Sequence, residues 1–418
     1  MSGALTRSVL VIGDGIVGLG AAIALRRALP SAAITLVQLP SDSGGWIDRL
    51  GAASPVVHKF HRQIGLDPKL FVRRTKAEPV FLRRYVRADA TELREASTAT
   101  IPFVEGVALH QIWLRHRAEA DEPTPDFAAM LLALRDARGD EGGFGARFDP
   151  AAYAALLGEM AAALAVTRHD SADIEVKADG NVLHGVVIAT GETLTADLYI
   201  DAAGPRSRLL TALGVGWHDW SPWLPSLTLT VAPGGMAATG EELLTTATHG
   251  LRWQTRLWDA SIAPGGDAAP GRLAQSWQAN AVAIGEAAVR APAADGSLLA
   301  NALEDILRVI ALLPRPGSRG RDVLEYVRRA AIAQDALADW SSLTLAADGA
   351  PRPDGLGAML ETFDKRGRIA PRELDPFPPG QWLARLMALR PPPRRIDPTA
   401  LALSDDVIRT TIARAAPQ

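Results

Sequence analysis

A glycine-rich turn near the start of the chain constrains its fold more than any other feature. Residues 9–26 read Val-Leu-Val-Ile-Gly-Asp-Gly-Ile-Val-Gly-Leu-Gly-Ala-Ala-Ile-Ala-Leu-Arg, an apolar strand that runs through the turn into a helix. In a dinucleotide-binding βαβ unit, Gly13 allows the tight turn, Gly15 lets the backbone approach a pyrophosphate, and Gly18 lets the helix pack close to the strand. The stretch therefore predicts an α/β fold with a Rossmann-like, dinucleotide-binding domain. The alternative is a glycine-rich turn with a purely structural role.

The residues on both sides of the turn support the nucleotide interpretation. Val9 to Ile12 form the expected strand, a helix is expected from about Gly15 to Leu29, and a second strand, Ala33 to Leu39, ends about twenty residues after Gly18. Gln38 stands near the end of that strand, where an Asp or Glu usually accepts hydrogen bonds from the adenosine ribose. Because an amide oxygen accepts without charge, we expect Gln38 to hold a cofactor more loosely.

The composition excludes several classes of protein. The chain has 418 residues, of which 48% are hydrophobic and 22% charged, as in ordinary globular proteins. A net charge of −3 favours neither nucleic acid nor an anionic membrane as a partner. The absence of cysteine excludes disulfides and thiolate chemistry, and the histidine spacing predicts no metal site. No apolar run reaches the about 18 residues that cross a bilayer, so we expect a cytoplasmic protein.

The first half of the chain alternates between regular and irregular patterns. A Gly/Ser-rich turn is expected at Ser41 to Trp46, and a helix at Pro55 to Ile64. Alternating apolar and basic residues predict strands from Phe71 to Tyr85, and Arg87 to Asp126 is irregular enough to be a substrate-side excursion. Asp149 should then cap an alanine-rich helix that runs to about Leu164.

The second half predicts more strands and then helices. A β-meander is expected over residues 172–200, a second sheet over 228–257, a short strand at 281–284, a helix at 297–313, and mostly helices beyond. This pattern predicts a discontinuous nucleotide-binding domain over residues 1–90, 145–215 and 275–312. The substrate-side region would comprise 91–144 and 216–274, and a C-terminal helical region 313–418.

Three segments occur in an order that resembles FAD-dependent aromatic hydroxylases. They are the N-terminal glycine turn, residues 197–204 that end in Asp201-Ala202-Ala203-Gly204, and Ala283-Ile284-Gly285-Glu286-Ala287-Ala288. Within that superfamily the chain resembles the tryptophan halogenase-like proteins. The likeness continues through Arg147-Phe148-Asp149, residues 219–225, residues 360–367 and Gln381-Trp382-Leu383.

This resemblance implies a two-component reaction that uses FAD. A separate flavin reductase supplies reduced FAD, the flavin hydroperoxide oxidises a halide, and a lysine presents the electrophilic halogen to an indole or another electron-rich aromatic compound. Lys76 falls at the position of that lysine, where apolar surroundings would lower the pKa of its amine. The alternative for Lys76 is a solvated side chain that pairs with Glu78 or a nearby Asp.

The resemblance also assigns the remaining flavin and halide residues. Cofactor-binding residues would be Gly13, Gly15, Gly18, Gln38, Gly51, Gly204, Gly285, Glu286 and Gly296. Glu286 would offer its carboxylate to the ribityl chain, or else act only as an acid at a helix N-terminus. Gly296 and Ser297 would leave backbone amides open to a halide, although a carboxylate at Asp295 would repel that anion unless Asp295 only caps the following helix.

Several family motifs are altered in this chain. The Trp-x-Trp-x-Ile-Pro motif reads Leu251-Arg252-Trp253-Gln254-Thr255-Arg256 and keeps one tryptophan. The Gly-Glu-Ala-Thr stretch reads Gly51-Ala52-Ala53-Ser54, and Ala294 replaces the glutamate that works beside the lysine. Trp253 is our candidate for stacking a substrate or shielding the flavin, against the alternative of core packing.

Three functions therefore remain open at this stage. The first is a divergent FAD-dependent halogenase or monooxygenase with Lys76 as its catalytic residue. The second is a non-catalytic partner protein that kept the fold, and the third is an aromatic hydroxylase without halogenation. Expected partners are a small aromatic substrate and, transiently, a flavin reductase, while a homodimer stays open.

Overall fold

The fold is described by a computed structural model. It covers residues 6–40, 45–120, 122–138, 145–238, 240–247, 250–266, 268–314, 320–345 and 350–416. Most of the turn predicted at 41–46 lies outside the described residues.

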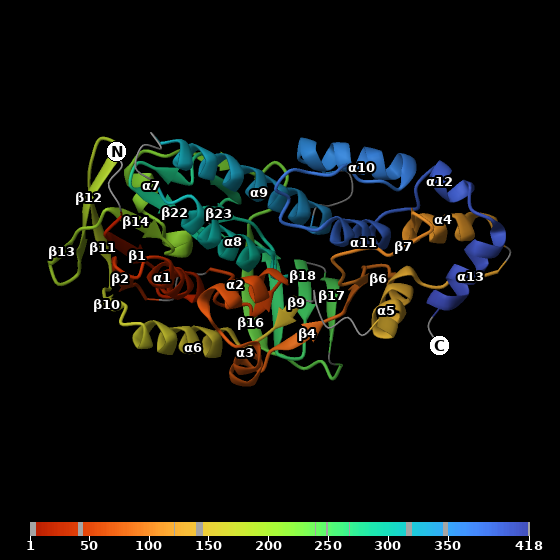
Figure 1. The fold of residues 1–418 in the computed structure, drawn as a ribbon, viewed down its shortest axis with the longest axis horizontal. Helices are drawn as coiled ribbons and strands as arrows, with labels where there is room; N and C mark the ends of the chain where they lie inside the picture. Colours follow the sequence, from red (N-terminus) through yellow and green to blue (C-terminus); the bar gives the residue numbers. More distant parts are fainter. Residues whose placement is uncertain are drawn as a thin grey trace.

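A six-stranded sheet of mostly parallel strands forms one end of the molecule (Figure 1). Its order is β10-β2-β1-β14-β22-β21, and only β21 runs antiparallel to its neighbour. The strands are β1 (Ser8–Ile12), β2 (Ala33–Gln38), β10 (Thr167–Asp170), β14 (Leu198–Asp201), β21 (Trp277–Gln278) and β22 (Ala281–Ala283). The α/β class and the opening β-α-β unit predicted from the glycine turn are confirmed.

Three helices cover this sheet. They are α1 (Ile16–Ala28), α6 (Pro150–Ala163) and α8 (Ser297–Ala311), and α1 contacts both of the others. The prediction for α6 is confirmed in detail, because the Asp149 carboxylate accepts a hydrogen bond from the Ala152 amide at 3.0 Å. The first two predicted meander strands are β11 (Ile174–Asp179) and β12 (Val182–Ile188), which pair with each other, and β12 also pairs with the short β13 (Thr193–Leu194). The chain then joins the parallel sheet as β14.

A second six-stranded sheet occupies the centre of the molecule (Figure 1). Its order is β16-β19-β18-β17-β5-β6, which confirms the second sheet predicted after residue 228 and adds two strands from the N-terminal half. The strands are β5 (Leu82–Val86), β6 (Glu92–Ala96), β16 (Leu227–Pro233), β17 (Glu241–Ala247), β18 (Gly250–Gln254) and β19 (Trp258–Pro264). Small sheets are formed by β3 (Ala52–Ala53), β4 (Glu78–Val80) and β9 (Gly145–Arg147), by β15 (Trp217–Asp219), β20 (Gly271–Leu273) and β23 (Val289–Arg290), and by β7 (Phe103–Val104) with β8 (Val107–Ala108).

The C-terminal helices extend from α8 towards the end of the molecule farthest from β11–β13, with α9 beside α8 and α12 and α13 at that end (Figure 1). They are α9 (Arg321–Leu345), α10 (Asp354–Arg366), α11 (Pro379–Leu389), α12 (Pro398–Leu401) and α13 (Asp405–Ala415). Two helices from the region expected to be irregular, α4 (Leu109–Glu119) and α5 (Phe127–Arg138), contact α13. The remaining helical segments are α2 (Val56–Ile64), α3 (Pro68–Thr75), α7 (Leu209–Ala212), η1 (Gly204–Arg206) and η2 (Gly285–Ala287).

Two local predictions are wrong. Residues 71–75 belong to helix α3 and not to a strand, because the Asp67 carboxylate accepts a hydrogen bond from the Lys69 amide and Pro68 opens the helix. The region 87–126 is also more regular than expected, since it contains β6 and α4. No helix in the described part of the chain is long and apolar enough to cross a membrane.

Candidate functional site

The glycine turn between β1 and α1 has the close packing that its sequence predicts. Gly13 has a φ of +137°, and a Cβ there would lie 2.4 Å from the carbonyl oxygen of Ala202. A Cβ at Gly18 would lie 2.3 Å from the carbonyl oxygen of Gly13. Any side chain at either position would therefore separate α1 from the sheet, as the motif requires.

The space in front of the turn is filled by the chain itself. We call residues 45–50 the closing segment. Its Asp48 Oδ1 accepts a hydrogen bond from the Ile16 amide at 2.8 Å, and a Cβ built on Gly15 would lie 2.0 Å from Asp48 Oδ2. A carboxylate of the protein thus occupies the helix N-terminus that the sequence assigns to a pyrophosphate.

The same segment is held at a second point by Glu286. This carboxylate accepts hydrogen bonds from the amides of Trp46 at 2.8 Å and Ile47 at 2.9 Å. Burial raises the pKa of Glu286 to about 7, and burial together with Asp14 raises the pKa of Asp48. Glu286 therefore anchors the closing segment where the resemblance expects it to meet a ribityl chain.

The other residues assigned to the flavin also contact the protein. Gln38 Oε1 accepts a hydrogen bond from Arg168 Nε at 2.8 Å. A Cβ at Gly51 would lie 1.6 Å from the Phe148 carbonyl oxygen, and one at Gly296 would lie 2.7 Å from the carbonyl carbon of Ala53. These contacts require glycine for packing at both positions.

Gly204 and Gly285 adopt the left-handed backbone conformation that favours glycine. Their φ angles are +60° and +59°, and each residue opens a short 3-10 turn, η1 or η2. These turns follow β14 and β22, so the structure does place them beside the glycine turn at the carboxyl ends of parallel strands.

As folded here, the residues at this site do not fit FAD. A pyrophosphate at the start of α1 would meet the Asp48 carboxylate, which already accepts the Ile16 amide, with Asp14 nearby. Repulsion between two such charges about 4 Å apart is about 4 kcal/mol at an effective dielectric of about 20. The glycine framework, by which we mean Gly13, Gly204 and Gly285 with their turns, is present, but the closing segment occupies the space in front of it.

Lys76 lies outside both of the sites that it was expected to connect. It is exposed at the C-terminus of α3, with a φ of +55°, and its amide donates to the Val72 carbonyl oxygen. Glu78, the alternative partner, forms an ion pair with Arg256. The apolar surroundings expected around the Lys76 amine are therefore not observed, and Val80 is the residue of this stretch that faces the neighbouring cleft.

That cleft, between the second sheet and the C-terminal helices, is almost filled. Its cavity measures about 50 Å³. Such a space holds a few water molecules, whereas pockets for small ligands measure about 300–1,000 Å³. Of the two residues assigned to a halide, Ser297 lines the cleft, and its amide donates a hydrogen bond to Asp295, which also lines it, at 3.1 Å.

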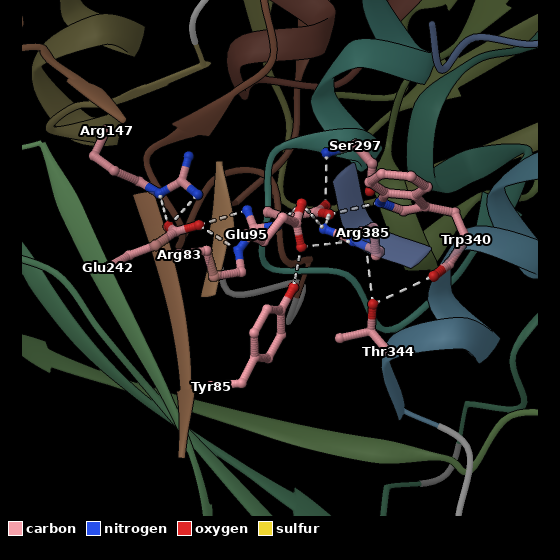
Figure 2. Close-up of polar contacts among 10 residues, drawn as sticks. Arg83, Tyr85, Glu95, Arg147, Glu242, Ser297, Trp340, Thr344 and Arg385 are labelled. Carbon is pink, nitrogen blue, oxygen red and sulfur yellow. Dashed lines mark hydrogen bonds and ion pairs between the residues drawn. The ribbon is translucent and has the colours of Figure 1, made fainter. Parts of the chain in front are cut away.

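Charged side chains line the cleft, and Figure 2 shows the polar contacts among them. We call this set the ionic network: it contains the arginines Arg83, Arg147 and Arg385 and the carboxylates Glu95, Glu242 and Asp295. Its ion pairs are Arg83–Glu95, Arg83–Glu242, Arg147–Glu242, Arg385–Glu95 and Arg385–Asp295.

The ionic network joins separate parts of the fold. Glu242 on β17 lies between Arg83 on β5 and Arg147 on β9, with a distance of 2.9 Å from Arg147 Nε to Glu242 Oε2. Arg385 on α11 donates to Glu95 on β6 at 3.1 Å and 3.3 Å. Three positive and three negative charges balance, which is the arrangement that burial of charge requires.

Asp295 connects the network to helix α9. Its Oδ2 accepts hydrogen bonds from Trp340 Nε1 at 2.6 Å and Arg385 Nη2 at 3.1 Å, and the Arg385 guanidinium lies 3.6 Å from the centre of the Trp340 ring. Burial opposes ionisation, but Arg385 and Arg83 hold the pKa of Asp295 well below its ordinary value. Arg147 and Arg83 likewise lower the pKa of Glu242 against the effect of burial.

Trp253 lies in the core beside this network. It is 3% exposed on β18, and the Arg83 guanidinium lies 5.0 Å from its ring centre. The structure therefore places it in protein packing, in line with the alternative stated for this residue. Among the described residues, no group of three histidine or acidic side chains could hold a metal ion.

Comparisons with known proteins place these observations in a family context. The sequence profile described as tryptophan halogenase matches residues 8–263 and 266–405. No curated protein sequence matches the chain.

Solved structures share the fold at low sequence identity. The flavin-dependent halogenase BrvH from Brevundimonas sp. BAL3 is 20% identical with a TM-score of 0.85, over 98% of this chain and 95% of that one. Xcc4156, a flavin-dependent halogenase from Xanthomonas campestris, is 21% identical with a TM-score of 0.86, over 99% and 94%. The tryptophan 6-halogenase SttH from Streptomyces toxytricini is 18% identical with a TM-score of 0.83, over 98% and 95%.

Proposed function

This chain belongs to the tryptophan halogenase family, and we propose that it is a non-catalytic member that acts by binding and does not halogenate. The observation that carries the proposal is the position of the closing segment. Asp48 takes the amide at the start of α1, and Glu286 takes the amides of Trp46 and Ile47. The start of α1 and Glu286, which the sequence assigned to FAD, therefore both bind residues of the closing segment.

The cleft beside the second sheet supports the same proposal. An indole needs several times the cavity volume of about 50 Å³ that remains among the ionic network. Opening the cleft would separate buried ion pairs, and an unpaired buried charge costs about 3–5 kcal/mol. Lys76, which was expected to deliver the halogen, is exposed on α3 and does not line this cleft.

A titration with FAD tests the proposal. We expect purified protein to show no saturable binding of oxidised or reduced FAD at micromolar concentrations. Asp48→Ala should gain measurable binding, because it removes the carboxylate in front of α1. Asp149→Ala is the matched control, since it removes a carboxylate from the N-terminus of another helix, α6, and should gain none.

A second candidate, a flavin-dependent halogenase or oxygenase, is favoured by the intact glycine framework. Gly13, Gly204 and Gly285 keep the backbone conformations that bring their turns together. In that case the closing segment would move away, FAD would bind, and a flavin reductase would supply it in reduced form. Micromolar binding of FAD by the unmodified chain, with a halogenated or hydroxylated product from an indole panel containing reductase, NADH and bromide, would replace our proposal with this one.

A further inference from the structure

A second cavity, of about 390 Å³, is lined in part by Trp46 and Arg49 of the closing segment. Its volume falls in the range of about 300–1,000 Å³ that is typical of small-molecule pockets. We call it the arginine pocket, after the two arginines in its wall. Its wall includes Trp46, Arg49, Pro205, Glu286, Arg290 and Pro292.

Arg290 carries a charge that the protein only partly compensates. Its Nη2 donates to the Pro205 carbonyl oxygen at 3.0 Å, and its guanidinium lies 4.8 Å from the centre of the Trp217 ring. Its Nε is buried and has no hydrogen-bond partner. No carboxylate in the described part of the chain forms an ion pair with Arg290. Burial lowers the pKa of this guanidinium, and the nearby Glu286 only partly opposes that effect.

Arg49 contributes a second positive charge to the same pocket. Its Nη2 donates to the Leu229 carbonyl oxygen at 2.5 Å, and over the described residues it has no ion-pair partner. Glu286 is the acidic residue in the wall, but both of its oxygens already accept amides of the closing segment. The pocket therefore has an excess of positive charge in a protein whose net charge is −3.

The rest of the wall suits a flat apolar group. Trp46 is half-buried at the edge of the pocket, and prolines and aliphatic residues form most of the remaining surface. A planar ring can stack on an indole, while guanidinium groups bind carboxylates and phosphates through charge-assisted hydrogen bonds.

We propose that the arginine pocket binds a small aromatic anion, whose carboxylate or phosphate is held by Arg49 and Arg290 while its ring lies against Trp46. This inference rests on the proposed function, because Trp46 and Arg49 line the pocket only while the closing segment keeps its position against α1 and Glu286. A carboxylate and a phosphate present the same chemistry here, so the experiment compares both.

Equilibrium dialysis with matched probes tests this binding. Indole-3-acetate is compared with neutral indole and cationic tryptamine, and phenyl phosphate with neutral phenol. We expect at least one anion to bind about tenfold or more tightly than its uncharged counterpart, in keeping with the strength of charge-assisted hydrogen bonds. Arg290→Gln and Arg49→Gln should each lower that affinity about tenfold, and Arg290→Lys should lower it less.

Arg73→Gln is the control, because it removes an equal charge from an exposed position on α3. Thermal unfolding of each variant verifies that it is folded. If folded protein prefers neither anion over its counterpart, or if Arg290→Gln binds the preferred anion as tightly as the unmodified chain does, the inference is overturned while the proposed function stands. Tight binding of FAD would overturn the proposed function instead, which the FAD titration detects separately.

Discussion

Replacing Glu286 by glutamine should change how the stability of this protein depends on pH. The carboxyl group is buried, and burial raises its pKa from 4.5 to about 7 even though two amides donate to it. Because the folded state binds this proton more tightly than the unfolded state, the stability linked to Glu286 is fully present below pH 4.5. It is lost as the pH rises through about 7.

The size of the effect follows from the two pKa values. One pKa unit corresponds to about 1.36 kcal/mol, so a rise from 4.5 to about 7 corresponds to about 3 kcal/mol in total. Most of it, about 2.5 kcal/mol, is lost between about pH 5 and about pH 8. Glu286→Gln removes the titration, and it replaces one acceptor oxygen by an amide nitrogen at a cost of about 1 kcal/mol.

Urea denaturation across this pH range, followed by tryptophan fluorescence, measures the difference. The unmodified protein should be the more stable of the two near pH 5, and Glu286→Gln the more stable near pH 8. Glu175→Gln is the control, since Glu175 is exposed on β11 and should leave the pH dependence unchanged. If Glu286→Gln and the unmodified protein lose the same free energy of unfolding between these two pH values, the reasoning about this buried carboxyl is refuted.

Three other substitutions test the remaining parts of the argument. Glu242→Gln should lower the free energy of unfolding by about 3–5 kcal/mol, because it leaves Arg83 and Arg147 buried without their shared carboxylate; a loss below about 1 kcal/mol in urea denaturation would contradict this. Trp340→Ala should lower the free energy of unfolding by about 3–5 kcal/mol in the same assay, because it leaves a cavity at a buried position. An unchanged free energy of unfolding would show that the cleft tolerates opening. Lys76→Ala should change the free energy of unfolding by no more than about 0.5 kcal/mol, because Lys76 is exposed. It should also leave the yield of any product in the halogenation assay unchanged, and a loss of product would show that this lysine takes part in the reaction.

Much of the fold can be predicted from local patterns. The glycine turn, the alternation after residue 228 and the cap at Asp149 are short-range signals, and the corresponding elements β1–α1–β2, β16–β19 and α6 are all present. Helix α3 has an equally local signal, Asp67 followed by Pro68, which outweighs the alternation that suggested a strand. Helix α4 lacks a side-chain cap, and it is stabilised by its contacts with α12 and α13.

The site was less predictable because its contacts span long distances in sequence. Glu286 binds amides 240 and 239 residues away, and Arg385 reaches Glu95 across 290 residues. Ala52 and Ala294, which stand where the family has glutamates, indicated altered chemistry, but they did not indicate which groups would fill the space. No signal in the sequence singles out Asp48 as the group that occupies the start of α1.

The sequence by itself determined the opening β-α-β unit and the family, because glycine spacing and apolar alternation act through backbone sterics over a few residues. Only the tertiary structure decided whether the start of α1 is accessible to a phosphate. Whether Asp48 or a phosphate receives the Ile16 amide depends on where the closing segment lies. That position is set by Glu286, which is distant in sequence but adjacent in the fold. Burial then decides the protonation and pairing of these carboxylates, since the cost of a buried charge depends on what surrounds it.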